Sequence, residues 1–307
     1  MTARSTPVWF SPRTLCFLGL ITISIAFAWR DLVAVVRAAL QVDQYTHILI
    51  IVPLSVALIY LEARSVFQNV SYAPAAAAGL VATAAVFAYF PGHAGALGTG
   101  DVLSLSMFCF AGWWISAFVL AYGRQSFRKA RFPLLLLLLL VPVPSRILDW
   151  VVSILQNSSA DVTYWLMRAA HVPVFRRDVI LSLPGIDIEV AKECSGIRSS
   201  LMLLIVSLVL AHLFLRTGSR KILLSIAVLP ITVFKNALRI FTLSTLAVYV
   251  DPSFLTGRLH EYGGIPFFVL ALGSLLLVLW GLQRSERKKG GPHPQTSASP
   301  VLAGSRL

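Results

Sequence analysis

Long apolar runs recur along the whole chain, and they constrain the fold more than any other feature of the sequence. "TLCFLGLITISIAFAW" at 14–29 and "PAAAAGLVATAAVFAYFP" at 74–91 are two of them. A helix needs about 20 mainly apolar residues to cross a bilayer. A soluble domain of 307 residues lacks the interior to bury a composition that is 57% hydrophobic and only 13% charged, with a mean hydropathy of +0.79. The sequence therefore predicts an all-α polytopic membrane protein.

We predict about eight transmembrane helices within a single transmembrane domain, residues 1–283, followed by a disordered basic cytoplasmic tail at 284–307. The fifth apolar run is shorter than a usual span and must recruit part of the next segment or be buried by its neighbours. Ala26-Phe27-Ala28 resembles a signal-peptide cleavage site, but an uncleaved first span is favoured. The predicted spans are 14–29, 47–61, 74–91, 102–122, 132–144, 197–215, 222–248 and 264–282.

The formal net charge of +13 is concentrated in short connections between the apolar runs. This placement agrees with the positive-inside rule and argues against nucleic-acid binding. With eight spans, three basic clusters and the N-terminus fall on one side, which is predicted to be cytoplasmic, so both termini are cytoplasmic. The clusters are Arg124, Arg128, Lys129 and Arg131; Arg216, Arg220 and Lys221; and Arg284, Arg287, Lys288 and Lys289.

The longest segment predicted on the external side is 145–196. Its first part mixes apolar residues at helical spacing with charged ones, which predicts an amphipathic helix lying at the membrane interface. "VILSLPGIDIEVA" then alternates apolar and polar positions on both sides of Pro184-Gly185, a pair that suits the centre of a type II turn. We expect a small β-hairpin that ends shortly before Cys194.

Cys194 is the cysteine predicted to lie at the external surface, whereas Cys16 and Cys109 fall within spans. Ser195 and Gly196 make a plausible helix start, where free amide groups and the helix dipole stabilise a thiolate. Arg198 adds a positive charge one turn further on. The alternative is an unreactive cysteine at a helix N-terminus.

Two further segments place polar residues at the same predicted depth. "FKNALRIF" puts Arg239 in the outer half of the seventh span, where a charged side chain usually faces protein or water and serves function. Asn236 lies three residues earlier on the same helix face, and we expect it to orient the guanidinium of Arg239. "GRLHEYGG" puts His260 at the outer mouth of the eighth span. Taken alone, Arg239 has an alternative role as a structural ion-pair partner, and His260 as a solvated side chain.

Together these three side chains match the needs of cysteine acyl transfer. That reaction requires a thiolate nucleophile, an acid to protonate the leaving amine and a donor for the tetrahedral oxyanion. Cys194, His260 and Arg239 are predicted to fill these roles in that order, without a metal ion or another cofactor.

"LPGIDIEVAKECSGIRSSL", "KNALRI" and "HEYGG", in this order and each beside its own predicted helix, resemble the exosortase/archaeosortase family of membrane transpeptidases. Weaker similarity in "YTHILIIVPLSVALIYLEAR" and "FPLLLLLLLVPVP" extends the resemblance over about residues 45–280. Asp178 stands where the family pattern leads us to expect glycine in the hairpin, and the substitution is expected to affect register and not chemistry.

The resemblance implies a sortase-like cysteine endopeptidase and transpeptidase of the cytoplasmic (inner) membrane. Its substrates would be secreted proteins that end in a short motif such as Pro-Glu-Pro, a transmembrane helix and a basic tail. Cleavage would occur on the periplasmic or extracellular side, through a thioester on Cys194, with Arg239 as the oxyanion and thiolate stabiliser and His260 as the acid/base. Asn236, Arg198, Ser195 and Gly196 match motif positions and are expected to bind substrate or support the site. The acceptor is open, and a nucleophile linked to lipid or polysaccharide is one choice.

Two other functions remain open from the residues. A small-molecule or ion transporter would use Lys235, Arg239 and His260 along an anion or proton path, but would make no use of Cys194. A non-catalytic subunit of polysaccharide secretion would tolerate alanine at Cys194, Arg239 and His260.

Overall fold

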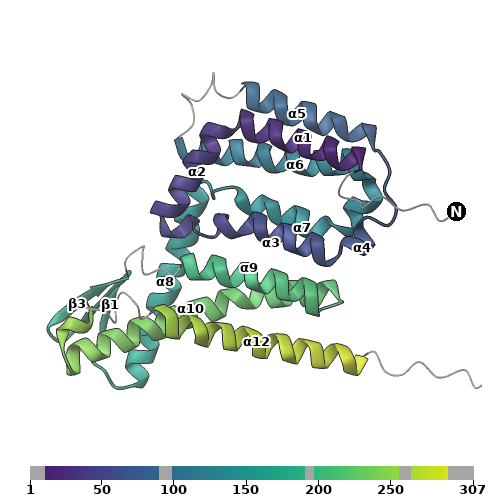
Figure 1. The fold of residues 1–307 in the computed structure, drawn as a ribbon. Helices are drawn as coiled ribbons and strands as arrows, with labels where there is room; N and C mark the ends of the chain where they lie inside the picture. The colour runs from purple at the N-terminus through teal and green to yellow at the C-terminus, as the bar shows by residue number, and fades with distance from the viewer. Residues whose placement is uncertain (1–10, 90–98, 191–196, 256–263, 290–307) are drawn as a thin grey trace, which may run out of the picture.

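A computed structural model describes residues 11–89, 99–190, 197–255 and 264–289. Helices run roughly parallel to one another in two groups, and a small sheet projects at one end (Figure 1). We call the first group, residues 12–140, the N-terminal bundle, and the second, residues 145–169 with 197–289, the C-terminal bundle. The described helices of the N-terminal bundle are α1 (Pro12–Phe27), α2 (Trp29–Gln41), α3 (Ile48–Leu61), α4 (Ala63–Val66), α5 (Ala77–Tyr89), α6 (Thr99–Lys129) and α7 (Arg131–Leu136), with the 3₁₀ turns η2 (Asp43–Tyr45), η3 (Pro74–Ala76) and η5 (Leu137–Leu140). Those of the C-terminal bundle are α8 (Ser145–Ala169), α9 (Ile197–Phe214), α10 (Gly218–Tyr249) and α12 (Gly264–Lys289), with the 3₁₀ turn η7 (Pro252–Leu255).

The N-terminal bundle is built around α6, which packs against α1 and α5 (Figure 1). Its core is rich in aromatic rings. Phe118 and Tyr122 of α6 lie 5.0 Å apart between ring centroids, and Phe17 of α1 meets both. Near its end α6 kinks at Gly123, whose φ of 86° is a conformation that L side chains rarely adopt, and a Cβ there would lie 2.5 Å from the backbone oxygen of Ser71.

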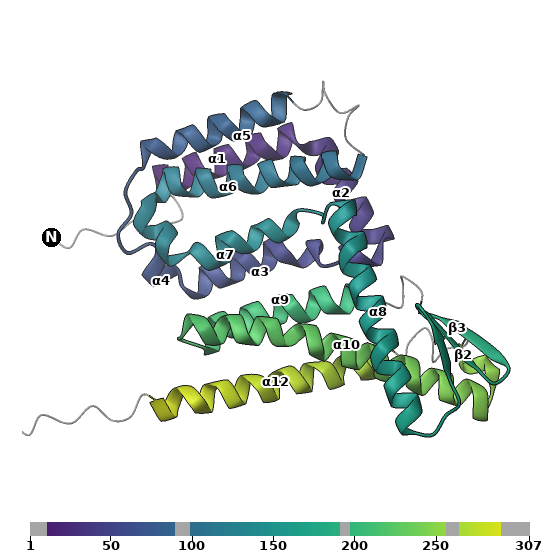
Figure 2. The same ribbon diagram turned by 180° about the vertical axis from the view of Figure 1, so that it is seen from behind.

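The C-terminal bundle is centred on α10, which packs against α8, α9 and α12 (Figure 2). Its core is mainly aliphatic and contains Leu203 of α9, Leu224 of α10 and Leu275 of α12. Helices α9 and α12 both run away from the sheet, whereas α10 runs towards it, so the outer half of α10 lies between the starts of its two neighbours.

Helix α8 crosses the bundle direction instead of running along it. The α7–η5 segment and α8 meet at a bend of 94°. Trp150 and Trp165 are exposed on α8, as expected for a helix that lies at the interface between membrane and water. Its other face is buried and contributes Leu155, Ala160 and Met167.

A three-stranded antiparallel sheet comes after α8, in the order β1 (Phe175–Arg177), β2 (Ile180–Leu183) and β3 (Ile186–Glu189). Leu183 of β2 pairs with Ile186 of β3 across Pro184-Gly185, and Gly185 has a φ of 82°, which the second central position of a type II turn requires. Strand β1 was not predicted. It pairs with β2 through a turn in which Asp178 has a φ of 53°. Aspartate tolerates this left-handed conformation better than most residues, which explains how Asp178 stands where glycine was expected.

The three basic clusters predicted from the sequence gather at the end of the molecule opposite the sheet, where α6 and α12 end and α7 and α10 begin (Figure 1). Glu286 on α12 forms an ion pair with Arg220 on α10 and accepts the backbone N–H of Thr217, which fastens two of these connections together. We call this the basic end, and the opposite one the sheet end.

Among the described residues, four helices are long and apolar enough to cross a membrane, and the number rises to six if each of two bent pairs is one span. The four are α6, α9, α10 and α12. The bent pairs are α1 with α2, at 75°, and α7–η5 with α8, while α3 and α5 are shorter apolar helices. Each of the eight predicted runs contains a helix, but a count of eight spans stays a prediction.

Two boundaries differ from the prediction. Residues 30–46 were expected in an external connection, but 30–41 belong to α2, which buries Val35 and Ala39 on one face. Helix α12 continues to Lys289, so the first six residues of the predicted disordered tail are helical and the remainder lies outside the described residues.

Candidate active site

The structure describes three of the seven predicted site residues. Asn236 and Arg239 lie on α10, and Arg198 lies in the first turn of α9. Cys194, Ser195, Gly196 and His260 lie outside the described residues. The described part of the site is therefore the α10 turn that carries Arg239, together with the side chains that surround that turn.

The α10 turn from Lys235 to Arg239 lies at the sheet end of the C-terminal bundle. Asn236 and Ala237 are completely buried, Lys235 is 6% exposed and Arg239 is half-buried. Two basic residues and an amide inside an apolar span are costly, so their retention points to a specific role. The guanidinium of Arg239 keeps its charge and presents several N–H donors, which suits it to hold a developing anion.

Asn236 anchors this turn to α8. Its Nδ2 donates to the hydroxyl of Ser159 at 3.1 Å, and the Thr163 hydroxyl donates to the backbone oxygen of Ala237 at 3.3 Å. Within the described residues, Oδ1 of Asn236 has no hydrogen-bond partner. The expectation that Asn236 orients the guanidinium of Arg239 is therefore wrong, because the amide N–H is directed to α8 and the amide oxygen receives no donor from Arg239. Asn236 acts instead on the packing of α8 against α10.

Lys235 anchors the same turn to α9. Its Nζ lies 2.5 Å from the hydroxyl of Ser199, which is in the first turn of α9. Because α9 and α10 are antiparallel, the next turn of α10, which carries Arg239, lies about 6 Å further towards the sheet end, at the level where α9 begins. This bridge was not predicted. A signal existed, because a Ser at 199 and a Lys at 235 are each unusual in a predicted span.

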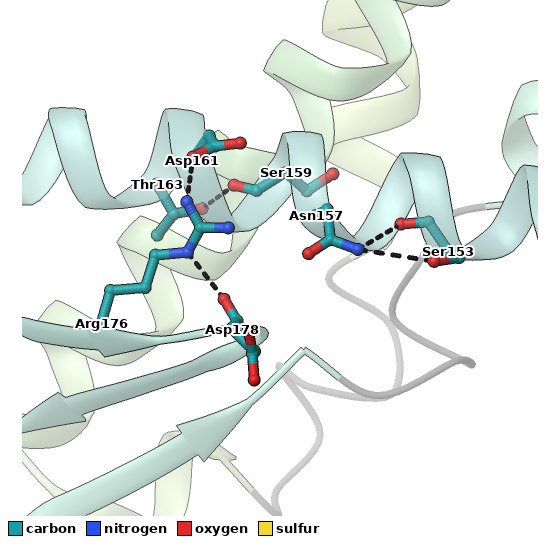
Figure 3. Close-up of polar contacts among 7 residues, drawn as sticks. All are labelled: Ser153, Asn157, Ser159, Asp161, Thr163, Arg176 and Asp178. Carbon is teal, nitrogen blue, oxygen red and sulfur yellow. Dashed lines mark hydrogen bonds and ion pairs between the residues drawn. The ribbon is translucent and has the colours of Figure 1, made fainter.

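The sheet is fastened to α8 next to this turn (Figure 3). Arg176 of β1 forms an ion pair with Asp161 of α8, and its Nε donates to the backbone oxygen of Asp178 at 2.7 Å. Gln156 of α8 also donates to the backbone oxygen of Val190, immediately after β3, at 2.7 Å. Val190, the last described residue before α9, is thus held on α8, about one turn from the Ser159–Asn236 contact.

The other thiols lie in the N-terminal bundle. Because both fall within predicted spans, both are expected to be small buried apolar residues. This expectation is confirmed for Cys109, which is buried on α6, and wrong for Cys16, which is exposed on α1. In the part of the chain that is described, no group of three or more His, Cys, Asp or Glu side chains is placed to hold a metal ion. The described turn offers the hydrogen-bond donors of Arg239 and its fixed positive charge, next to the ammonium group of Lys235.

These features define a class: a helical membrane protein whose small extramembrane sheet and crossing helix hold a charged turn of a central span near one face of the bilayer. A family model for transmembrane exosortases matches residues 15–281 of this chain. The chain belongs to the transmembrane exosortase family. Searches of curated proteins and of solved structures give no match.

Proposed function

We propose that this exosortase-family protein is a membrane cysteine endopeptidase and transpeptidase that removes C-terminal sorting signals from secreted proteins. Cys194 is the nucleophile, His260 the acid/base and Arg239 the oxyanion donor. Ser195, Gly196 and Arg198, which follow the nucleophile in the sequence, bind substrate or support the site, and Asn236 supports it through α8.

One observation carries the proposal: Arg239 lies at the level where α9 begins, on a turn fixed to α8 by Asn236 and to α9 by Lys235. Cys194 is three residues before Ile197, so the covalent chain keeps their Cα atoms within about 11 Å of each other. His260 is four residues before Gly264, so the Cα atoms of these two residues lie within about 14 Å of each other. Since α9 and α12 both begin beside the outer half of α10, these limits permit the three side chains to meet in one pocket.

The proposed chemistry assigns one step to each group. The Cys194 thiolate attacks the scissile carbonyl carbon, and Arg239 N–H groups stabilise the negative oxygen of the tetrahedral intermediate. His260 donates a proton to the leaving amine as the C–N bond breaks, which leaves a thioester on Cys194. An acceptor nucleophile, or water, then attacks the thioester and regenerates the thiolate.

The substrate class is inferred from the family resemblance and from the location of the turn. A substrate with one transmembrane helix and its cleavage motif just outside that helix presents the scissile bond near the membrane surface, where α8, the sheet and Arg239 lie. We place this surface on the external side of the cytoplasmic membrane, because the opposite end carries the three basic clusters. The acceptor is a separate molecule whose nucleophile reaches the same surface.

The transporter alternative receives no support from the described side chains. A path for anions or protons needs its charged groups to face a water-filled space. Lys235 is instead 6% exposed and hydrogen-bonded to Ser199 between two packed helices. The contact of Lys235 with Ser199 joins α10 to α9 and is structural.

The experiment that tests the proposal is proteolysis by the purified protein in proteoliposomes, with a reporter that ends in a Pro-Glu-Pro motif, an apolar helix and a basic tail. Cys194→Ala is expected to abolish cleavage while membrane insertion and the elution volume of the protein stay unchanged. Cys16→Ala is the matched control, because it removes an exposed thiol of the N-terminal bundle, and it is expected to retain full activity. Cleavage by the Cys194→Ala protein would rule out this mechanism.

A further inference from the structure

A large groove separates the two bundles along α9. It has a volume of about 1040 Å³. Leu155 of α8 and Ile197 of α9 line it towards the sheet end, and His212 of α9 and Lys221 of α10 line it at the basic end. The groove therefore extends along α9 for its whole length, and α9 runs across the molecule from one end to the other (Figure 1).

The middle of the groove is apolar. Leu201, Leu204 and Leu208 of α9 form one wall, and Ile226 and Leu229 of α10 lie beside them. Ile226 and Leu229 are 55% and 60% exposed, so this part of the C-terminal bundle is not covered by the N-terminal bundle. Such a wall suits the hydrocarbon chains of a lipid.

The basic end of the groove carries an excess of positive charge. Arg128, Lys129, Arg131 and Lys221 line it. The Lys129 ammonium donates to the backbone oxygen of Ser65 at 2.7 Å and to Gln68. In the described part of the chain, the ion pairs at this end are Glu62–His212 and Arg220–Glu286, and neither includes Arg128, Arg131 or Lys221.

The acidic side chain that lines this end is already engaged. Oε1 of Glu62 lies 2.7 Å from Nε2 of His212, and the His212 ring stacks on Phe132 with the ring centroids 4.1 Å apart. This contact joins α3, α7 and α9 across the groove. Even with Glu62 counted as fully charged, four basic side chains line this end against one carboxylate.

We propose that this groove binds an anionic phospholipid, with its phosphate among Arg128, Arg131 and Lys221 and an acyl chain along the leucines of α9. Basic pockets between transmembrane helices are the sites that recognise such headgroups, and an apolar slot beside the pocket adds selectivity for a lipid over a soluble phosphate. The groove reaches the start of α9 near the proposed catalytic turn, but the phosphate site lies at the basic end, and its occupancy does not depend on the proposed reaction.

Charge favours a lipid over a transmembrane helix of a substrate. A substrate helix with a basic tail would place positive charge against Arg128, Arg131 and Lys221, and like charges at short distance repel each other. The phosphate of an anionic lipid is attracted by the same three side chains.

The test is native mass spectrometry of the purified protein from nanodiscs that contain equal amounts of phosphatidylglycerol and phosphatidylcholine. The wild type is expected to retain phosphatidylglycerol selectively. The variant Arg128→Gln/Arg131→Gln/Lys221→Gln is expected to lose this preference, by roughly fivefold for each charge at low ionic strength and about 100-fold in all. Leu208→Trp, which fills the apolar slot and leaves the charges in place, is expected to reduce retention as well.

Two matched controls separate a specific site from a general charge effect. Arg124→Gln/Arg216→Gln/Arg287→Gln removes three exposed charges from the same end that do not line the groove, and it is expected to retain the lipid. Arg128→Lys/Arg131→Lys/Lys221→Arg keeps the charge and is expected to retain it too.

Four results would overturn the proposal. Equal losses of lipid preference in the groove variant and in the Arg124/Arg216/Arg287 control would show that binding depends only on the total surface charge. Equal retention of both lipids by the wild type would show that the groove has no preference for an anionic lipid. Displacement by glycerol 3-phosphate would identify a soluble phosphate ester as the occupant. Displacement by a synthetic peptide with an apolar helix and a basic tail would identify a substrate helix instead.

Discussion

The two bundles use buried polar side chains in different ways. In the N-terminal bundle several such groups complete bonds between helices: the Trp113 indole donates to the backbone oxygen of Leu20, the Trp114 indole to the hydroxyl of Ser24, and the Ser55 hydroxyl to the backbone oxygen of Pro133. The buried hydroxyl of Ser126 on α6 has no partner among the described residues. On α10 of the C-terminal bundle, three buried polar atoms have no partner among the described residues. They belong to Thr232, Asn236 and Ser244.

Under the proposed function, this difference would separate a region that stabilises the molecule from a region that carries chemistry. Satisfied bonds and aromatic packing fix helices in place, because few alternatives exist for a polar group in an apolar surrounding. Unpaired polar atoms lower stability and are retained where something else benefits from them. The comparison predicts that substitutions in the N-terminal bundle change stability with little effect on chemistry, and that substitutions around Asn236 and Arg239 do the reverse.

The largest effect is expected from Phe118→Ala in the aromatic core of the N-terminal bundle. Phe118 is 2% exposed, and its loss leaves a cavity between α1, α4 and α6. We expect a loss of about 3–5 kcal/mol in the free energy of unfolding. Thermal unfolding in detergent measures it, and the folded fraction is expected to keep its specific activity.

Phe234→Ala is the control for that change, because Phe234 of α10 is 51% exposed and its removal leaves no internal cavity. An equally large loss of stability at Phe234 would show that the two bundles do not differ in packing.

The next largest effect is expected from Arg239→Ala, which should lower activity and leave stability nearly unchanged. If Arg239 stabilises the oxyanion, kcat/KM for reporter cleavage falls about 10²–10³-fold while the melting temperature changes little. Arg239→Lys is expected to recover part of the activity, because it restores the charge without the fork of donors. Single-turnover cleavage in proteoliposomes measures both.

Arg37→Ala provides the comparison in the N-terminal bundle, since Arg37 is an exposed arginine of α2. Unchanged turnover by Arg239→Ala, or an equal fall in Arg37→Ala, would remove Arg239 from the chemistry.

A smaller effect is expected from the contact between Asn236 and Ser159. A double-mutant cycle with Asn236→Ala and Ser159→Ala is expected to give a coupling free energy of about 0.6–1.7 kcal/mol, the range found for hydrogen bonds between transmembrane helices. Each single variant is also expected to lower kcat, because α8 no longer holds the turn that carries Arg239. A coupling energy near zero would mean that the two helices are positioned by apolar packing alone.

The smallest effect is expected from Trp114→Phe and Ser24→Ala, which form the corresponding contact in the N-terminal bundle. Their coupling free energy is expected to be about 0.6 kcal/mol, with kcat unchanged. A fall in kcat as large as that for Asn236→Ala would contradict the division of roles between the bundles. Parallel unfolding and cleavage assays on the same preparations decide the matter.

The sequence was a good guide to local structure. Apolar runs predicted the helices, since the length of an apolar stretch is a direct consequence of the bilayer thickness. Alternation on both sides of Pro184-Gly185 predicted β2 and β3. Strand β1 was missed because Phe175-Arg176-Arg177 shows no such alternation, and its polar contacts come from Asp161 and Asp178. Helix α2 was missed although Val35 and Ala39 repeat at helical spacing, because its charges favoured an external connection.

Contacts between distant segments were predicted less well from the sequence than local structure was. Asn236 and Ser159 are 77 residues apart, and Lys235 and Ser199 are 36 apart. Periodicity shows which residues share a face of α10, but it does not show which helix covers that face. For this reason the partner of Asn236 was assigned wrongly to Arg239. The grouping of Cys194, Arg239 and His260 stays a prediction that rests on covalent reach and on the family resemblance.

The crossing of α8 over the bundle has a consequence for where a cut falls along a substrate. If α8 lies at the interface between membrane and water, its position along the membrane normal is set by the lipid headgroups. The contacts of Ser159 and Thr163 with α10 then fix the position of α10 relative to those headgroups. On this interpretation the guanidinium of Arg239 keeps a fixed distance from the bilayer surface. Under the proposed function, the scissile bond would be selected by its distance from that surface, so a longer linker between the substrate's helix and its motif would move the bond away from Arg239 even when every motif residue is unchanged.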